Sequence, residues 1–162
     1  MSQATGYFTH KECWRHEMGA GHPECPERLD AIEDRLLISG LDVALERREA
    51  TPAAIADLEL AHGRMHLAAL RGLSDQLRDD MAAGGPDHAQ VDPDTSINPH
   101  SWDAILMAAG AAIDATDAVI AGELANQFGQ LASRGWAHPA TLLENKTPPG
   151  LHSTDRCDST HQ

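Results

Sequence analysis

The segment Gly21-His22-Pro23-Glu24-Cys25-Pro26-Glu27-Arg28-Leu29 joins an irregular loop to the start of a helix. Pro26 suits the first helical turn, because its φ angle is already helical and the N–H that it lacks would have no partner there. Apolar residues then recur with the helical period, and Gly40 is able to end the helix in the left-handed conformation. The pattern predicts one amphipathic helix whose apolar face holds Leu29, Ile32, Leu36 and Leu37.

Similar patterns predict the elements on either side. A short run of aromatic and β-branched residues predicts a strand over Gly6–Thr9, and a second short strand is expected over Leu45–Ala50. Thr51-Pro52 and Asn98-Pro99 each place a capping residue before a first-turn proline, which predicts a helix through Leu60 and a long helix that includes Ile120. A further helix is expected near Met65 to Met81, with loops over His10–Cys25 and from Gly84 to Ser96.

The last part of the chain differs from the rest. Residues 127–162 contain no clear strand pattern and are interrupted by glycine and proline, so they are predicted to be mostly loop or disorder. The negative charge is also concentrated before residue 127.

Composition limits the classes of partner. The 162 residues carry a formal net charge of −13, which repels nucleic acid phosphates and anionic membrane surfaces and attracts polycations. We therefore expect no nucleic acid and no membrane partner. Three cysteines and the absence of a signal peptide pattern predict a reduced, cytoplasmic protein.

Together with Asp92-Pro93-Asp94-Thr95, the segment around His22 resembles the histone deacetylase family, which includes bacterial acetylpolyamine amidohydrolases and acetoin-utilisation proteins. The resemblance runs from about residue 5 to about residue 126. It implies an α/β fold, namely the N-terminal fragment of the arginase/deacetylase-type fold, with a parallel sheet flanked by helices. The chain is then mostly helical as it stands, with a partial deacetylase-like domain over residues 1–126 and a non-matching, irregular tail over 127–162.

The resemblance also implies a reaction. The family hydrolyses acetyl-lysine or acetylpolyamine amides with a zinc ion, which polarises the carbonyl group and activates water. Its zinc ligands and its paired histidines after a Pro-Pro step have no secure counterpart here. Thr147-Pro148-Pro149-Gly150-Leu151-His152-Ser153 echoes the paired-histidine motif but has Leu151 in place of the first histidine. We therefore expect no bound zinc and no activity from this chain alone, and we assign no catalytic residue and no metal ligand.

The rim of the family's substrate channel does have counterparts. The resemblance places His22, Pro23 and Glu24 beside the channel and makes Asp94 the candidate that holds the backbone of an acetylated lysine or polyamine substrate. A purely structural interpretation stays open, because the prolines fix an entry turn and Asp94 could brace a turn of its own.

Two other functions stay open. The acidic helices could form an interaction or structural module, or could pair with a complementary protein fragment that carries the zinc site. Alternatively, the spacing of five residues resembles that of metal ligands and predicts a small zinc-binding module over His10–Cys25. Its candidate ligands are His10, Cys13, His16, His22 and Cys25.

Overall fold

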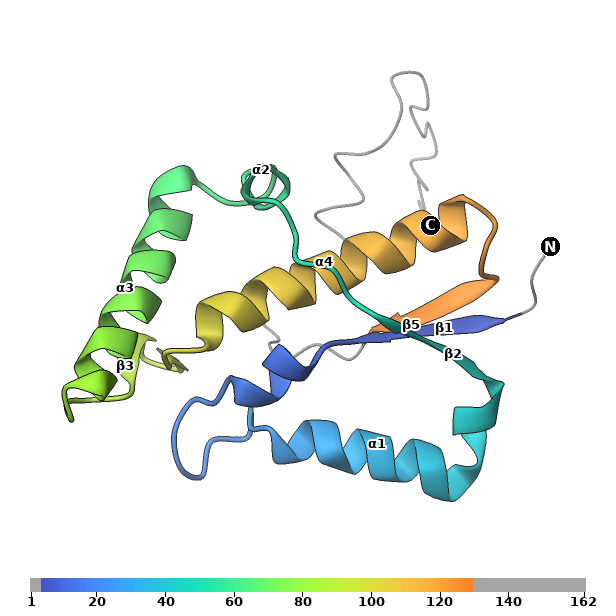
Figure 1. Ribbon diagram of the computed structural model, residues 1–162, viewed down its shortest axis with the longest axis horizontal. Helices are drawn as coiled ribbons and strands as arrows, with labels where there is room; N and C mark the ends of the chain where they lie inside the picture. The colour runs from blue at the N-terminus through green and yellow to red at the C-terminus, as the bar shows by residue number, and fades with distance from the viewer. Residues whose placement is uncertain (1–3, 130–162) are drawn as a thin grey trace, which may run out of the picture.

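The computed structural model describes residues 4–129, which form a small parallel sheet with helices on both faces (Figure 1). The sheet has the order β2-β1-β5, and β1 pairs in parallel with both neighbours. Its strands are β1 (Thr5–Thr9), β2 (Leu45–Glu49) and β5 (Asn126–Gly129). The longer helices are α1 (Glu27–Ser39), α3 (Arg64–Ala82) and α4 (Ser101–Ile120); the short elements are η1 (Lys11–Arg15), η2 (Leu41–Ala44), α2 (Ile55–Leu58) and the hairpin β3 (Ala89–Asp92) and β4 (Thr95–Ile97).

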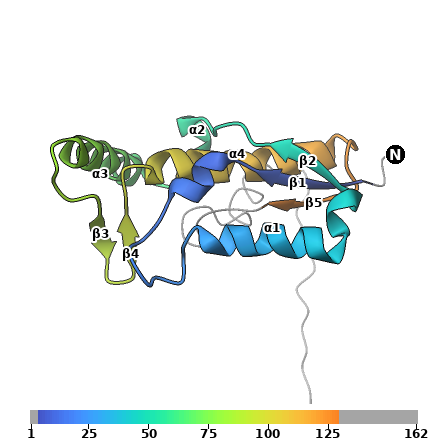
Figure 2. The ribbon, with the colours of Figure 1, turned by 60° about the horizontal axis from the view of Figure 1, so that its bottom comes forward.

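The central strand β1 directs successive side chains to opposite faces of the sheet. Phe8 is 2% exposed and packs in a cluster with alanines of α4. Tyr7 is fully buried on the other side, where its hydroxyl donates to Glu33 Oε1 of α1 at 2.6 Å. Figure 2 shows α4 and α1 on opposite sides of the sheet.

Helix α4 packs closely because its buried face is built from small residues. An added Cβ at Gly110 would lie 1.6 Å from the Thr51 carbonyl oxygen. A larger residue at this position would therefore displace the segment that follows β2. The Ala53 N–H donates to the Leu106 carbonyl at 3.0 Å, and the Thr51 N–H donates to Asp114 Oδ2 at 2.8 Å. These contacts hold the segment that leads from β2 to α2 along the helix.

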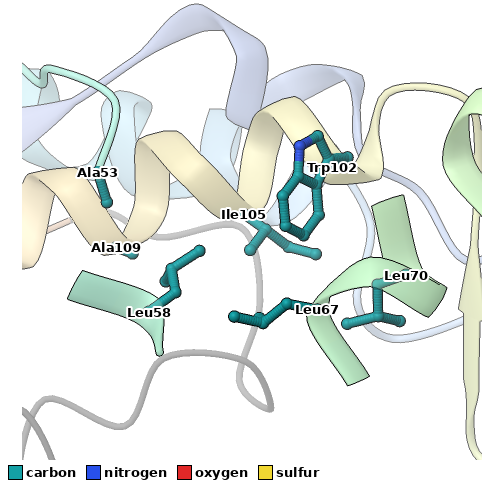
Figure 3. Packing of buried hydrophobic residues seen from close by; sticks show 7 residues of the cluster. All are labelled: Ala53, Leu58, Leu67, Leu70, Trp102, Ile105 and Ala109. Atoms are coloured by element: carbon teal, nitrogen blue, oxygen red, sulfur yellow. The ribbon is translucent and has the colours of Figure 1, made fainter. Parts of the chain in front are cut away.

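A second cluster joins α2 and α3 to the first half of α4 (Figure 3). Leu58 comes from α2, Leu67 and Leu70 come from α3, and Trp102 and Ile105 come from α4. Burial of such side chains stabilises the fold by about 1.5–3 kcal/mol each. This cluster therefore anchors the helical end of the structure, which also carries the β3–β4 hairpin.

Several predicted elements differ from the structure. The predicted loop from Gly84 to Ser96 contains most of the β3–β4 hairpin, whose strands are too short and polar to show in the sequence. Strand β5 lies across the predicted boundary after residue 126, although Asn126-Gln127-Phe128-Gly129 has a low strand propensity. It forms because β1 offers an unpaired edge for parallel pairing.

The predicted helix starts are also too early. Helix α2 begins at Ile55 because Thr51 bonds to Asp114 instead of capping the helix. Helix α4 begins at Ser101, although Asn98 Oδ1 does accept the His100 N–H at 3.0 Å, a capping-type bond within the turn that leads into the helix. A 3-10 helix, η1, lies inside the predicted loop over His10–Cys25.

The predicted irregular tail lies outside the described residues, apart from its first three positions, which belong to β5. The Thr147–Ser153 motif lies outside them as well. Over residues 4–129, none of the helices has both the length and the apolar character needed to cross a membrane.

Replacing Gly110 by alanine should lower the free energy of unfolding by about 2 kcal/mol or more, because the new methyl group overlaps backbone atoms that cannot move independently. Gly72→Ala is the matched control, since Gly72 is at an exposed position of α3. No atom lies within 4 Å of the place that a Cβ would take there. That change should raise the free energy of unfolding by about 0.5–1 kcal/mol. Urea unfolding of both variants checks this, and equal effects would show that α4 tolerates a larger side chain at the contact.

Candidate functional site

The candidate site lies where β1 ends. The loop that follows Thr9 carries η1 and then His22, Pro23 and Glu24 before α1 begins. In open α/β sheets the carboxyl ends of parallel strands are the usual place for ligand sites. We call residues 16–25 of this connection the rim loop.

Local contacts shape the rim loop. Gly19 and Gly21 adopt φ angles of 101° and 80°, which residues with a side chain rarely adopt. The Glu24 N–H donates to His22 Nδ1 at 3.0 Å, and Arg28 Nη2 donates to Glu24 Oε1 at 2.7 Å. The Glu24 side chain is only 13% exposed, so its carboxylate is directed to Arg28 and not to solvent.

Asp94 occupies the turn of the β3–β4 hairpin and is exposed. Its N–H donates to Asp92 Oδ1 at 2.9 Å, so Asp92 and not Asp94 braces the turn with its side chain. The approach to the hairpin contacts the rim loop, because His88 Nε2 lies 3.7 Å from Glu17 Oε1. The structure thus brings the hairpin and the rim loop to the same end of the sheet.

A buried polar network holds these parts together. Ser101 Oγ lies 2.8 Å from His16 Nδ1 in the rim loop and donates to Asn98 Oδ1 at 3.0 Å. Asn98 Nδ2 donates to the Arg15 carbonyl at 2.8 Å. From α3, the buried Ser74 hydroxyl bonds to the carbonyl of Pro99 at 3.1 Å. The network therefore joins the rim loop, the end of the hairpin, α3 and the start of α4.

His16 is buried beside this network and is 4% exposed. Burial lowers the pKa of its imidazole, because the charged form loses its hydration; the nearby Glu24 carboxylate opposes this effect, and His22 and His88 add to it. Burial also lowers the pKa of His100, with Arg15 and Arg78 acting in the same direction. Both histidines are therefore favoured in the neutral form.

The five proposed ligands of a small zinc module do not converge. Cys13 is 2% exposed and packs with Leu29, and His16 bonds to Ser101. His10 Nδ1 accepts the Glu12 N–H at 3.2 Å, and His22 Nδ1 accepts the Glu24 N–H. No group of three or more His, Cys, Asp or Glu side chains in the described part of the chain is placed to bind a metal ion. The structure therefore gives the zinc-module hypothesis no support.

The parallel sheet with helices on both faces defines an α/β protein. The loop that contains His22-Pro23-Glu24 and the acidic β3–β4 hairpin form a candidate site near the carboxyl end of β1. The chain belongs to the histone deacetylase family, since the model of the histone deacetylase domain matches residues 22–147. This match confirms the resemblance seen in the sequence and continues past residue 126, where we expected it to end.

Individual relatives support the same family assignment. The chain is 33% identical over 145 residues to a histone deacetylase-like amidohydrolase of Pseudomonas aeruginosa, with 79% of this chain and 36% of that protein covered. It is 30% identical over 150 residues to histone deacetylase 9 of Homo sapiens, covering 82% of this chain and 15% of that protein. The chain thus spans well under half the length of these relatives.

The solved structure of the HDA15 HD domain has the same fold, with a TM-score of 0.74 at 22% identity over 89% of this chain and 43% of that one. This similarity confirms the predicted fold class, an α/β fold of the deacetylase type with a parallel sheet flanked by helices.

The sequence located the rim loop and Asp94 but missed the residues that hold them. The sequence predicts a capping role for Asn98 and a metal-ligand role for His16, and no sequence pattern singles out Ser101. A signal was available for Asn98 alone, because capping residues bond to nearby backbone groups. The rim assignments of His22, Pro23, Glu24 and Asp94 stay predictions.

Acidification should weaken the fold before the carboxylates titrate. The pKa of folded His16 lies below its value of 6.5 in an unfolded chain, so the unfolded state binds more protons as the pH falls. The stabilisation is complete above about pH 6.5 and decreases below it. Urea unfolding between about pH 7.5 and about pH 5.5 checks this.

The control is His16→Asn, which retains a polar group near the position of Nδ1 but does not titrate in this range. The variant should lose much of the pH dependence, and His100, whose pKa burial also lowers, should contribute to what remains. A wild-type chain whose free energy of unfolding is constant or rises on acidification would contradict the assignment of a buried neutral His16.

Proposed function

We propose that the described part of this chain forms the substrate entrance of a zinc-dependent deacetylase that hydrolyses acetyl-lysine or acetylpolyamine amides. The observation that carries this proposal is the placement of the rim loop and the Asp94 hairpin at one end of the sheet in a member of the histone deacetylase family. In this proposal His22, Pro23 and Glu24 border the entrance.

Asp94 would bind the incoming substrate. Its exposed carboxylate lies at a hairpin turn that Asp92 already braces, which leaves its oxygen atoms available to accept hydrogen bonds from amide or ammonium N–H groups. The net charge of −13 would add a general attraction for a cationic tail or a polyamine. Glu24 would not bind substrate in the same way as Asp94, because Arg28 already binds its carboxylate.

The zinc ion of the family does not fit the described residues, which contain no suitable group of ligands. We infer that the metal ligands and the groups that move protons come from outside residues 4–129. The described residues then bind and orient substrate, and hydrolysis requires the remainder of a deacetylase domain.

A second candidate function is an interaction module that pairs with a complementary deacetylase fragment. Sheets usually have more than three strands, and parallel sheets are covered on both faces. Within residues 4–129 the outer edge of β5 has no partner strand, and its Phe128 is 46% exposed while stacking on Tyr7. Further large apolar side chains are exposed at the end of α1 and in η2, namely Leu37, Ile38, Leu41 and Val43. These features favour pairing with another segment.

Asp94→Asn should weaken the binding of a short acetyl-lysine peptide by roughly five- to tenfold, because a charge-assisted hydrogen bond becomes a neutral one. Peptide titration followed by NMR measures the affinity. Asp79→Asn, at an exposed position of α3, changes the net charge equally and should have little effect on the peptide affinity. An equal loss in both variants would show that general charge, and not Asp94, attracts the peptide.

The 162-residue chain should not hydrolyse acetyl-lysine or acetylpolyamine substrates when zinc is added. Activity should appear only when the remainder of a deacetylase domain is present, for example after mixing with a fragment of the related amidohydrolase that begins after the matched region. Stoichiometric zinc binding with metal-dependent turnover by the chain alone would overturn the proposal that the catalytic groups come from the remainder of a deacetylase domain.

A further inference from the structure

The hydrogen bonds around Ser101 determine which nitrogen of His16 carries a proton. Ser101 Oγ has three polar neighbours: the Asn98 N–H at 2.8 Å, Asn98 Oδ1 at 3.0 Å and His16 Nδ1 at 2.8 Å. A hydroxyl group has one proton to donate and two lone pairs that accept. Only one of the three contacts can therefore use the serine proton.

The orientation of the Asn98 amide is fixed by its other partners. Its Nδ2 donates to the Arg15 carbonyl at 2.8 Å, and its Oδ1 accepts the His100 N–H at 3.0 Å. The atom that faces Ser101 is thus an oxygen without a proton. Because two oxygen atoms at this distance need a proton between them, the serine hydroxyl donates to Asn98.

It follows that His16 Nδ1 must donate to Ser101. The neutral imidazole then carries its proton on Nδ1, and Nε2 has a free lone pair. Nε2 is buried and has no hydrogen-bond partner within the described residues. A second proton would place an unpaired N–H and a positive charge there, so the arrangement requires the neutral ring.

The groups that face His16 come from three segments. Ser101 lies on α4, and Glu24 and His22 lie in the rim loop itself. His88 precedes β3 and has its own acidic neighbours, with Asp87 Oδ1 at 2.9 Å and Glu17 Oε1 at 3.7 Å. Glu24 is paired with Arg28. Across residues 4–129, no acceptor among these groups reaches Nε2.

We propose that His16 is a positioning residue that, as the neutral Nδ1–H tautomer, couples the rim loop to the Asp94 hairpin through Ser101 and Asn98. Asn98 directly follows β4 and bonds both to Ser101 and to the chain at Arg15. One network therefore sets the relative position of the two parts of the entrance. The proposal rests on the proposed function only in treating these parts as an entrance.

The direct test is nitrogen-15 NMR of the histidine rings in the full 162-residue chain at neutral pH. We expect His16 to show a protonated Nδ1 and an unprotonated Nε2. In Ser101→Ala the acceptor is lost, so the ring should change toward the Nε2–H tautomer. A wild-type His16 that is already protonated on Nε2 would overturn the proposal, and so would a tautomer that Ser101→Ala does not change.

Amide hydrogen exchange tests the coupling. His16→Leu should accelerate exchange in the rim loop and at the hairpin by roughly tenfold, as expected for loss of one buried hydrogen bond. Ser101→Ala should accelerate it at least as much, because Ser101 also bonds to Asn98. The double variant should exchange no faster than Ser101→Ala, because the two residues share one bond. His16→Asn should restore slow exchange. His66→Asn, at an exposed position of α3, should leave the exchange rates of the rim loop and the hairpin unchanged.

Additive effects, or equal acceleration throughout α3 and α4, would reduce His16 to a packing residue and overturn the coupling. If His16→Leu does not fold, Ser101→Ala and His16→Asn still decide the result. Neither measurement involves substrate. A failure of the proposed function would appear as unchanged peptide binding in Asp94→Asn, with the tautomer and exchange results intact.

Discussion

The close contact between α4 and the segment after β2 is the constraint on which the other contacts depend. Gly110 lets the Thr51 carbonyl approach the helix to a distance that excludes any side chain, and Asp114 then binds Thr51 from the next turn. With this segment held, α4 covers the Phe8 face of the sheet, and its first half is free to pack against α2 and α3. The position of α4 in turn fixes Ser101, which bonds to the residues that hold the candidate site.

The candidate site combines irregular loops with rigid support. The rim loop and the hairpin turn consist largely of glycine, proline and charged residues, which have little apolar surface to bury. Their positions come from polar groups at the start of α4, where Asn98, Ser101 and His16 bond to one another in a buried setting. Buried hydrogen bonds are directional, so they specify a single arrangement that apolar contacts alone would leave loose.

Much of the fold could be predicted from local patterns. The strand over Gly6–Thr9 and the helix after Pro26 are found close to the expected residues, since hydrophobic period and proline placement act within a few positions. Strand β5 and the β3–β4 hairpin could not be predicted in this way. Asn126-Gln127-Phe128-Gly129 becomes a strand only through pairing with β1, and the hairpin depends on contacts with distant parts of the chain.

The sequence alone determined the family, the class of fold and the two segments that form the candidate entrance, because His22-Pro23-Glu24 and Asp92-Pro93-Asp94 are recognisable as local motifs. Tertiary structure decided what each side chain does. It directs Glu24 to Arg28, leaves Asp94 exposed and buries His16 against Ser101, which lies 85 positions away. The physical reason is that protonation, burial and hydrogen bonding depend on neighbours in space, and these are brought together only when the sheet and α4 have formed.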